Sequence, residues 1–331
     1  MSFLDGKSIL VTGGTGSFGQ AFVKYVLEHY KPSRLVVFSR DEFKQWQMQE
    51  RFPEKNYPSL RFFIGDIRDK DRLRLAFDGI DYVVHAAALK HVPTLEYNPF
   101  EAVKTNIIGT QNIIEVAIQM GVKKVVALST DKAVNPVNLY GATKLTMEKL
   151  LIAGNAYAGS KPTRFCVVRY GNVIASRGSV IQLFEKLVKE GAKELPITDE
   201  RMTRFWISLK EGVMLVIFAL ENCKGGELFV PKLPSVKVTD IAKAICPQCG
   251  FKIIGIRPGE KLHEVLISKE ESRNTYIFEK DGKQYFIILP HDRKTQDLEK
   301  LHEGFEYSSD KNDWWIKQEE LLEFLTMARQ E

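Results

Sequence analysis

The first half of the chain alternates short, almost wholly apolar runs with longer stretches of mixed polarity. Strands that are apolar at every position, and not only at every second one, are typical of a parallel sheet buried on both faces. Between the first two runs, Phe18, Phe22, Val26 and Tyr30 recur at every fourth position, which indicates a helix with one apolar face. This alternation predicts an α/β fold built on a doubly wound parallel sheet. The predicted strands are Ser8–Thr12, Arg34–Phe38, Arg61–Ile64, Tyr82–Ala86, Lys124–Ser129 and Phe165–Tyr170.

The regular alternation ends after Tyr170. Glycine, serine and arginine gather in residues 171–179, and prolines interrupt the chain beyond them. A later helix, Leu209–Leu220, and a later strand, Glu227–Val230, are nevertheless expected to return to the sheet. We therefore predict a first domain and a smaller, irregular α/β region that binds substrate. The predicted boundaries are 1–173 for the first domain, 208–232 for the returning segment, and 174–207 with 233–331 for the second region.

Composition narrows the classes of function. The chain has 331 residues, of which 44% are hydrophobic and 27% charged, as in an ordinary globular protein. Its formal charge of +5 is too small a surplus to indicate a nucleic-acid partner. No stretch approaches the roughly 20 apolar residues that span a bilayer, so no membrane partner is expected.

Four cysteines are too few for a disulfide framework in a chain of this size, which favours a reducing cytoplasm as the location. Cys246 and Cys249 offer two thiols, which is half of a structural zinc site. Cys166 falls in a predicted strand and Cys223 near a helix end, so neither is an obvious third ligand. We therefore expect no metal.

A glycine-rich loop follows the first predicted strand and opens the first predicted helix. In TGGTGSFG the glycines allow a tight turn, let backbone N–H groups approach a diphosphate, and let the helix pack close to the strand. The amino-terminal end of that helix favours the negative charge. A purely structural turn is the alternative, but it does not explain three glycines at this spacing. The pattern predicts a Rossmann-type dinucleotide-binding domain, with contacts at Gly13, Thr15, Gly16, Ser17, Phe18 and Gly19.

The end of the second predicted strand bears on the choice of dinucleotide. An enzyme that uses NAD usually has an acidic residue here, which holds the ribose 2′-hydroxyl. In this chain Ser39 and Arg40 come first, and Arg40 with Lys44 can bind a 2′-phosphate. Asp41 and Glu42 follow directly, and their acidic side chains favour NAD in part. The alternative to a phosphate-binding role is that Arg40 only covers a solvated loop. We favour NADP, bound by Ser39, Arg40, Asp41 and Lys44.

Further cofactor contacts are expected where the next strands end. Residues after the third predicted strand can support an adenine edge, and three small alanines follow the fourth. Small side chains let the backbone lie against a cofactor. A valine after the sixth strand is expected at the nicotinamide face. The predicted contacts in these segments are Asp66, Ile67, Ala86, Ala87, Ala88, Lys90, Asn106 and Val173.

The fifth predicted strand runs into STDKAVNPVNLYGATK, in which Tyr140 and Lys144 are four residues apart and share one helix face. A lysine ammonium beside a phenol favours the phenolate and lowers its pKa from about 10. Next to a nicotinamide, this tyrosine can take a hydroxyl proton as hydride leaves the adjacent carbon. Thr130, at the strand end, can hydrogen-bond the same hydroxyl. An amphipathic helix with an exposed lysine is the alternative interpretation.

These motifs together resemble the extended short-chain dehydrogenase/reductase family. The longer motifs AAALKHVP, RYGNVIASRGSV, ITDERMTRFWIS and IGIRPGEKLHE resemble the UDP-N-acetylglucosamine 4,6-dehydratases that invert C5, of the type that makes the pseudaminic acid precursor. The resemblance covers about residues 5–325 and is weaker at 247–251 and 269–296. It implies UDP-N-acetylglucosamine as substrate and a homo-oligomer, with a hexamer as one form.

Asp131 and Lys132 follow Thr130 directly, at the strand end where such folds gather catalytic groups. The resemblance implies that inverting dehydratases carry Asp-Lys here and C5-retaining ones Asp-Glu. A dehydratase needs a second acid and a second base, because it removes a proton from C5 and expels the C6 hydroxyl. Lys132 is a reasonable base only if burial or a nearby cation depresses its pKa. Alternatively, Lys132 pairs with Asp131 or a phosphate and transfers no proton.

The resulting hypothesis is a C5-inverting 4,6-dehydration. Tyr140 accepts the O4 proton while hydride passes from C4 to NADP, Lys132 removes the C5 proton, and Asp131 protonates the leaving C6 hydroxyl. Hydride then returns to C6, and C5 is reprotonated on its other face. The product is a UDP-2-acetamido-2,6-dideoxy-4-hexulose of L-arabino configuration.

Arginines are expected to converge on the UDP group, because it carries at least two negative charges. The resemblance points to arginines of the second region, with a glutamate on a ribose hydroxyl and a lysine near the sugar. A surface ion pair is the alternative for each of them. The predicted substrate contacts are Lys90, Asn172, Arg177, Gly178, Ser179, Val180, Thr198, Arg204, Arg257 and Glu260.

Three other functions compete with this hypothesis. A UDP-sugar 4-epimerase has the same scaffold, but the Asp131–Lys132 pair argues against it. A C5-retaining dehydratase differs only in product stereochemistry. A non-catalytic NADP-binding scaffold belongs to another class, and it would be expected to have lost Tyr140 or Lys144, both of which are present.

Overall fold

Seven parallel strands form the centre of the molecule, in a computed structural model that describes residues 2–174 and 179–330. Within these residues the main sheet has ten strands, because three antiparallel strands extend it beyond β10. Its order is β16-β14-β15-β10-β6-β5-β4-β1-β2-β3. The parallel strands are β1 (Ser8–Thr12), β2 (Arg34–Ser39), β3 (Leu60–Ile64), β4 (Tyr82–His85), β5 (Lys124–Thr130), β6 (Arg164–Tyr170) and β10 (Leu228–Pro231).

The predicted doubly wound α/β fold is confirmed. Each of the six predicted strands is present with its ends shifted by at most one residue, and every residue of β4 is buried. The chain builds β1, β2 and β3 outward in one direction and then returns to β4 on the other side of β1. Ligands of such sheets bind at this reversal point, outside the carboxyl ends of the strands.

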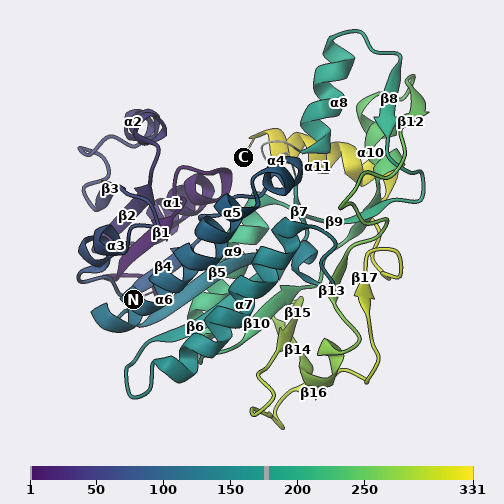
Figure 1. The fold of residues 1–331 in the computed structure, drawn as a ribbon. Helices are drawn as coiled ribbons and strands as arrows, with labels where there is room; N and C mark the ends of the chain where they lie inside the picture. Colours follow the sequence, from purple (N-terminus) through teal and green to yellow (C-terminus); the bar gives the residue numbers. More distant parts are fainter. Residues whose placement is uncertain (1, 175–178, 331) are drawn as a thin grey trace.

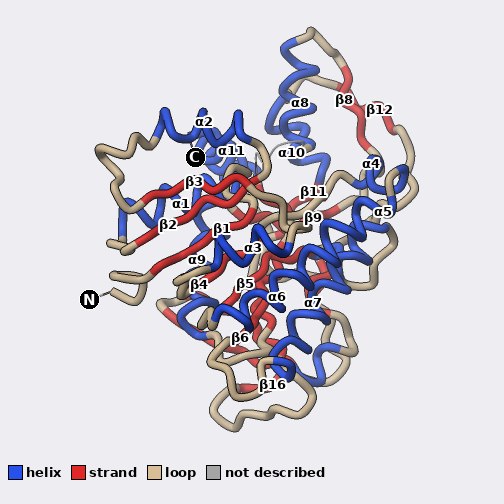
Figure 2. Tube along the Cα trace, turned by 60° about the vertical axis from the view of Figure 1, so that its left-hand side comes forward, coloured by secondary structure: helices blue, strands red, loops and turns tan. Residues whose placement is uncertain are grey.

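Helices cover both faces of the parallel strands (Figures 1 and 2). On one face α1 packs against α9, and on the other α3, α6 and α7 pack in a row. Three members of the predicted helical stripe, Phe18, Phe22 and Val26, lie on α1, with Phe22 and Val26 buried, and the fourth, Tyr30, directly follows the helix. The helices of this part are α1 (Ser17–His29), α2 (Glu42–Arg51), α3 (Lys70–Phe77), α4 (Val92–Tyr97), α5 (Pro99–Ala102), α6 (Gly109–Met120), α7 (Leu139–Tyr157) and α9 (Leu209–Asn222), with a π-helical turn η1 (Val103–Ile108) before α6 and a 3-10 turn η2 (Asp131–Ala133) after β5.

A second apolar core lies beyond the carboxyl ends of the strands, where Figure 1 shows α8, α10 and α11 around β8 and β12. Phe184, Trp206, Ile241 and Leu321 are buried in it. Its helices are α8 (Val180–Lys189), α10 (Val238–Ile245) and α11 (Gln318–Gln330). Its small sheets pair β7 (Asn172–Val173), β9 (Thr203–Ile207) and β11 (Ser235–Lys237), and then β8 (Glu194–Ile197) with β12 (Gly250–Ile253). A further pair, β13 (Val265–Ile267) with β17 (Tyr307–Ser308), buries Leu266, Ile267 and Tyr307 in the main core.

Segments of the main sheet and of the second region alternate along the chain more often than the sequence predicted. As expected, α9 and β10 lie with the main sheet, where β10 pairs with β6. The sequence assigned all of 233–331 to the second region, but β14 (Thr275–Lys280), β15 (Lys283–Ile288) and β16 (Glu299–Lys300) lie in the main sheet. They do so because β15 pairs antiparallel with β10 over four residues. The domain division itself stays a prediction.

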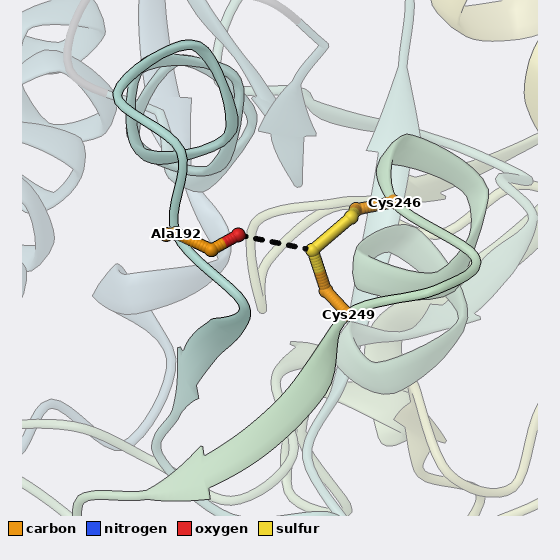
Figure 3. The surroundings of a disulfide bond; sticks show 3 residues. All are labelled: Ala192, Cys246 and Cys249. Carbon is orange, nitrogen blue, oxygen red and sulfur yellow. Dashed lines mark hydrogen bonds between the residues drawn. A yellow bond between two sulfur atoms is a disulfide. The ribbon is translucent and has the colours of Figure 1, made fainter.

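The structure contains a disulfide that the cysteine count did not lead us to expect. Cys246 and Cys249 are bonded, with their Cα atoms 5.4 Å apart. A turn after α10, in which the Cys249 N–H donates to the Cys246 carbonyl at 3.1 Å, brings the two residues together. Figure 3 shows the Cys249 sulfur facing the carbonyl oxygen of Ala192, 3.5 Å away. The bridge thus lies between the ends of α8 and α10. Cys166 and Cys223 are free and buried.

The described residues contain neither a long apolar helix nor a cluster of metal-ligating side chains. Within this part of the chain, no helix is both long and apolar enough to cross a membrane. Nor do three or more histidine, cysteine or acidic side chains come together there as a metal site would require.

A buried ion cluster joins the two parts through β6. Arg169 is only 1% exposed, and its guanidinium binds both oxygens of Glu148 on α7, at 3.0 and 2.6 Å. It also binds Glu271 at 2.9 Å, which lies in the 3-10 turn η3 (Glu271–Asn274), and the carbonyl of Leu266 at 2.9 Å. Removing one member of such a cluster leaves buried charge without a partner.

We expect Arg169→Met to destabilise the protein by about 3–5 kcal/mol, because Glu148 and Glu271 lose their shared cation. Urea unfolding followed by circular dichroism measures the change. Arg273→Met is the matched control, because Arg273 pairs with Glu303 at the surface, where the two side chains are 63% and 72% exposed. That variant should lose less than about 1 kcal/mol. Equal losses in the two variants would contradict a structural role for the cluster.

Candidate active site

The glycine loop between β1 and α1 brings backbone atoms close together at the reversal point of the sheet. Gly13 has a φ of 66°, and a Cβ there would lie 2.9 Å from the Cα of Ala87, at the end of β4. A Cβ on Gly19 would lie 2.5 Å from the Cα of Gly14, so α1 can approach the loop only with glycine at this position. The tight turn and the close helix packing that the spacing predicted are therefore present, while the approach to a diphosphate stays a prediction.

A cavity of about 300 Å³ opens beside this loop. Twelve of the predicted cofactor residues line it, from the loop and from the ends of β2, β3 and β4. They are Gly13, Thr15, Gly16, Ser39, Arg40, Asp41, Lys44, Asp66, Ile67, Ala86, Ala87 and Ala88. Phe38, Gly65, Leu89 and Thr105 also line it and were not predicted.

Thr105 offers a buried polar group to a ligand in this cavity. Its side chain is buried on η1, and its Oγ1 has no hydrogen-bond partner among the described residues. A buried hydroxyl of this kind is expected to bond a ligand. Together with the close backbone approach at Gly13, it suits a dinucleotide in the cavity. No spacing rule points to Thr105, because π-helical turns are rare and their register is not visible in a sequence.

The remaining predicted cofactor residues lie outside the lining of this cavity. Ser17 and Phe18 are in the first turn of α1, and Phe18 stacks on Phe22 at 6.0 Å between ring centroids. Asn106 binds both backbone groups of Leu89 at 2.9 Å, so it fixes the loop after β4. Lys90 is the next residue of that loop, and Val173 lies on β7.

The predicted catalytic residues come together at the carboxyl end of β5. Thr130 ends the strand, Asp131 and Lys132 form η2, and α7 begins at Leu139 with Tyr140 in its first turn. A Cβ on Gly141 would lie only 2.1 Å from the carbonyl oxygen of Lys132. The glycine after Tyr140 is therefore required for α7 to reach η2.

Tyr140 and Lys144 share one helix face as predicted, but their charge relation differs from the expectation. Burial raises the pKa of Tyr140 to about 12, although the charge of Lys132 opposes the rise. Lys144 donates to the carbonyl of Leu128 and lies 3.0 Å from the sulfur of Met147. Burial lowers the pKa of Lys144 to about 8. The Lys144 ammonium contacts Leu128 and Met147 and not the Tyr140 phenol. The phenolate form of Tyr140 is therefore not stabilised by Lys144 in the way that the sequence predicted.

Asp131 and Lys132 form a close pair. The Lys132 Nζ donates to Asp131 Oδ1 at 3.0 Å, and the Thr130 hydroxyl donates to the same oxygen at 2.9 Å. Asp131 is fully buried, and the side chain of Lys132 is 26% exposed. Burial disfavours the ammonium, but the carboxylates of Asp131 and Glu264 outweigh burial and raise the pKa of Lys132 above its ordinary range. The condition that the sequence analysis set for a base, a depressed pKa, is therefore not met in this arrangement, and the contact with Asp131 is the one named as the alternative.

The predicted substrate residues lie around the carboxyl edge, but not all face open space. Asn172 Oδ1 and Ser179 Oγ are buried without a partner among the described residues, which suits a polar ligand. The guanidinium of Arg204 donates to the backbone carbonyls of Thr203, Leu262 and Lys261, so it is hydrogen-bonded within the protein and does not face open space. Val180 begins α8, Thr198 follows β8, Arg257 and Glu260 lie in the loop after β12, and Arg177 and Gly178 are outside the described residues.

Two charged groups near this edge were not predicted. Glu264 is 2% exposed, and its Oε1 lies 3.7 Å from Lys132 Nζ. Lys261 donates to the carbonyl of Val134, directly after η2. Both belong to the segment GEKLHE, which the sequence singled out as a motif without assigning these residues. Their proximity to Lys132 comes from the packing of β13 on η2, which no local spacing reveals.

The glycine loop at the sheet reversal and the tyrosine–lysine pair beside β5 define a Rossmann-fold protein of the extended short-chain dehydrogenase/reductase class. More closely, the chain belongs to the family described as "Polysaccharide biosynthesis protein", whose model matches residues 9–285. A Campylobacter jejuni protein named UDP-N-acetylglucosamine 4,6-dehydratase (inverting) is 55% identical over 96% of this chain and 97% of its own. A Rickettsia canadensis protein named UDP-glucose 4-epimerase is 48% identical over 81% and 80%.

Solved structures resemble the chain as well. The X-ray structure of Pen from Bacillus thuringiensis has a TM-score of 0.90 and 41% identity, with 99% of each chain covered. The structure of DesIV, a dTDP-glucose 4,6-dehydratase from Streptomyces venezuelae with NAD and TYD bound, has a TM-score of 0.68 and 22% identity, with coverage of 77% and 86%. At that identity DesIV supports the fold alone.

We expect Gly13→Ala to weaken dinucleotide binding at least about tenfold, or about 1.4 kcal/mol, because the added Cβ meets the Ala87 backbone. Fluorescence titration with NADPH and with NADH measures the change. Gly121→Ala is the matched control, because Gly121 has a similar φ of 71° but open space around its Cβ. It should share the backbone strain and keep the affinity. Equal weakening in both variants would contradict the assignment of this loop.

Proposed function

We propose that this chain is a C5-inverting UDP-N-acetylglucosamine 4,6-dehydratase that uses NADP. The observation that carries the proposal is the Asp131–Lys132 pair, with 3.0 Å between its charged atoms, at the carboxyl end of β5 beside Tyr140. The printed name of the Campylobacter jejuni relative supports it. A C4 epimerase needs no second acid and base beside its tyrosine, whereas an elimination across C5 and C6 does.

Each residue has one task in the proposed reaction. Tyr140 takes the O4 proton, and Thr130 orients that hydroxyl. A bound nicotinamide would supply the hydride-accepting and hydride-donating chemistry that moves one hydrogen from C4 to C6. Lys132 takes the C5 proton, and Asp131 gives a proton to the C6 hydroxyl, which leaves as water. C5 then receives a solvent-derived proton on its opposite face, which gives the L-arabino 4-hexulose. Lys132 and Tyr140 release the two protons that they accepted, one to Asp131 and one to solvent.

Lys132 needs a proton acceptor before it can act as a base. Its raised pKa means that the amine is charged in this arrangement. Asp131 lies at 3.0 Å and needs a proton to act as the acid. Transfer of one proton from Lys132 to Asp131 therefore produces both working forms at once, the uncharged amine and the protonated carboxyl.

NADP is supported by the polar groups around the end of β2. Arg40 is 57% exposed on the cavity rim, where a 2′-phosphate can replace its 3.7 Å pairing with Asp66. Asp41 accepts from the Lys44 N–H as the cap of α2 and pairs with the Lys44 amine at 2.7 Å. An aspartate occupied in this way is less able to hold a ribose 2′-hydroxyl.

The decisive experiment is incubation with UDP-N-acetylglucosamine and NADP in heavy water. Mass spectrometry should show a product that has lost one water, and NMR of the fresh product should show a 4-ketone with inverted C5 carrying deuterium. An isomer of unchanged mass would indicate the epimerase activity named for the Rickettsia relative.

Lys132→Met should lower kcat about 100- to 10,000-fold, because it removes the base but keeps the length of the side chain. Unchanged turnover in that variant, or substrate hydrogen fully retained at C5, would contradict the role of Lys132.

Cofactor choice has its own test. We expect Arg40→Ala to raise the Kd for NADPH about tenfold and the Kd for NADH less than about twofold, because only the 2′-phosphate loses a charged partner. Fluorescence titration measures both constants. Arg61→Ala serves as the control, because Arg61 is an exposed arginine that pairs with Glu54 away from the cavity. Equal weakening of both cofactors by Arg40→Ala would contradict the preference for NADP.

A further inference from the structure

Glu264 occupies a fixed, buried position directly before β13. Its N–H donates to Ser309 Oγ at 3.0 Å, and its carbonyl accepts from the Ser309 N–H at 2.9 Å. The strand pair β13–β17 therefore determines where the carboxyl lies. Among the described residues, Glu264 Oε2 has no hydrogen-bond partner.

The carboxyl of Glu264 completes a cluster of four charges. Its Oε1 is 3.7 Å from Lys132 Nζ and 3.8 Å from Arg204 Nε, while Lys132 is also 3.0 Å from Asp131. The side chains of Asp131, Glu264 and Arg204 are 0%, 3% and 13% exposed. At this burial, the charge of one group has a strong effect on the protonation of the next.

The hydrogen bonding of this cluster is incomplete, unlike that of the Arg169 cluster. Asp131 Oδ2 and Glu264 Oε2 both lack partners among the described residues, whereas Arg169 binds both oxygens of Glu148. A buried carboxylate without enough hydrogen bonds is costly, and protonation reduces that cost. Burial raises the pKa of Glu264; the charge of Lys132 opposes the rise, and the charge of Asp131 adds to it.

We propose that Glu264 is a positioning residue that acts through Lys132 and controls the proton distribution in the Asp131–Lys132 pair, an inference that rests on the proposed 4,6-dehydration. When Glu264 is protonated it no longer offsets the positive charge of Arg204, and Asp131 is the one carboxylate that still pairs with Lys132 in this cluster. The Lys132 ammonium then gives its proton to Asp131, which yields the amine and the carboxyl that the elimination uses. Ionised Glu264 stabilises the ammonium and keeps that proton on Lys132.

The charged groups that face Glu264 come from three elements. Asp131 and Lys132 lie on η2, Arg204 lies on β9, and Lys261 lies in the segment before β13. The neighbouring His263 contacts the hydroxyl of Thr203 at 2.8 Å. The working form has Glu264 protonated, so kcat should fall as the pH rises through the raised pKa of Glu264.

The test is the pH profile of kcat for UDP-N-acetylglucosamine dehydration by Glu264→Gln. The amide has the shape of the protonated carboxyl and no charge at any pH. We expect the variant to lose the fall of kcat at alkaline pH that Glu264 causes. At pH values above that fall, kcat of the variant should be at least about threefold higher than kcat of the wild type. A residue with only a packing role would not give a faster enzyme in one pH range.

Glu227→Gln is the matched control, because Glu227 is equally buried at 3% exposure but pairs with Arg293 away from Lys132. It should keep the wild-type profile. Glu264→Met is a second neutral variant for the case that the Gln variant does not fold, because buried charges can be replaced by apolar side chains of similar volume. It should also lose the alkaline decrease.

Each other outcome has a defined meaning. A wild-type chain that does not dehydrate the sugar overturns the proposed function and this inference together. A wild-type dehydratase whose alkaline decrease persists in the neutral variants overturns this inference alone. The same holds if the variants are slower than the wild type by one factor at every pH, or if neither folds, because the carboxylate would then be a structural requirement.

Discussion

The candidate active site depends on how closely α7 approaches the turn after β5. The carbonyl of Lys132 occupies the space that any side chain on Gly141 would need. This one contact places Tyr140, from the helix, beside Asp131 and Lys132, from the strand end. Asn138 reinforces the contact, because it caps α7 and also binds the carbonyl of Gly259 at 2.7 Å. The two sets of proposed proton-transfer groups are therefore held together by backbone packing.

The sheet could be predicted from the sequence because burial on both faces leaves a local signature. The parallel strands are short runs of Val, Ile, Leu and Phe, and each begins or ends within one residue of its predicted limit. The strands β14 and β15 also contain apolar runs, but their place in the main sheet depends on the antiparallel pairing of β15 with β10, more than 50 residues earlier in the chain. Long-range pairing of this kind cannot be read from periodicity. The disulfide was missed for a related reason, because the closeness of Cys246 and Cys249 depends on the turn after α10.

The same limit applies to the site. Contacts that follow from a loop at a strand end, such as Gly13, Arg40 and Asp131, could be predicted because parallel strands end at one edge. Glu264 and Thr105 could not, because one reaches the edge through β13 and the other through a π-helical turn. The electrostatics were harder still. Whether the pKa of Lys132 is lowered, as a base requires, depends on how many carboxylates surround it, and the structure places two within 4 Å.

The interleaving of segments has a consequence for how this chain can be divided. A fragment that ends after β6 would lack β10, whose Leu228 and Phe229 pair with Val167 and Val168. It would also lack α9, which covers the same strands beside α1. The free edge of an apolar strand is a template for aggregation. Because β14, β15 and β16 also belong to the main sheet, that sheet is complete only once the chain has passed Lys300. No single cut in the chain therefore separates the main sheet from the second region.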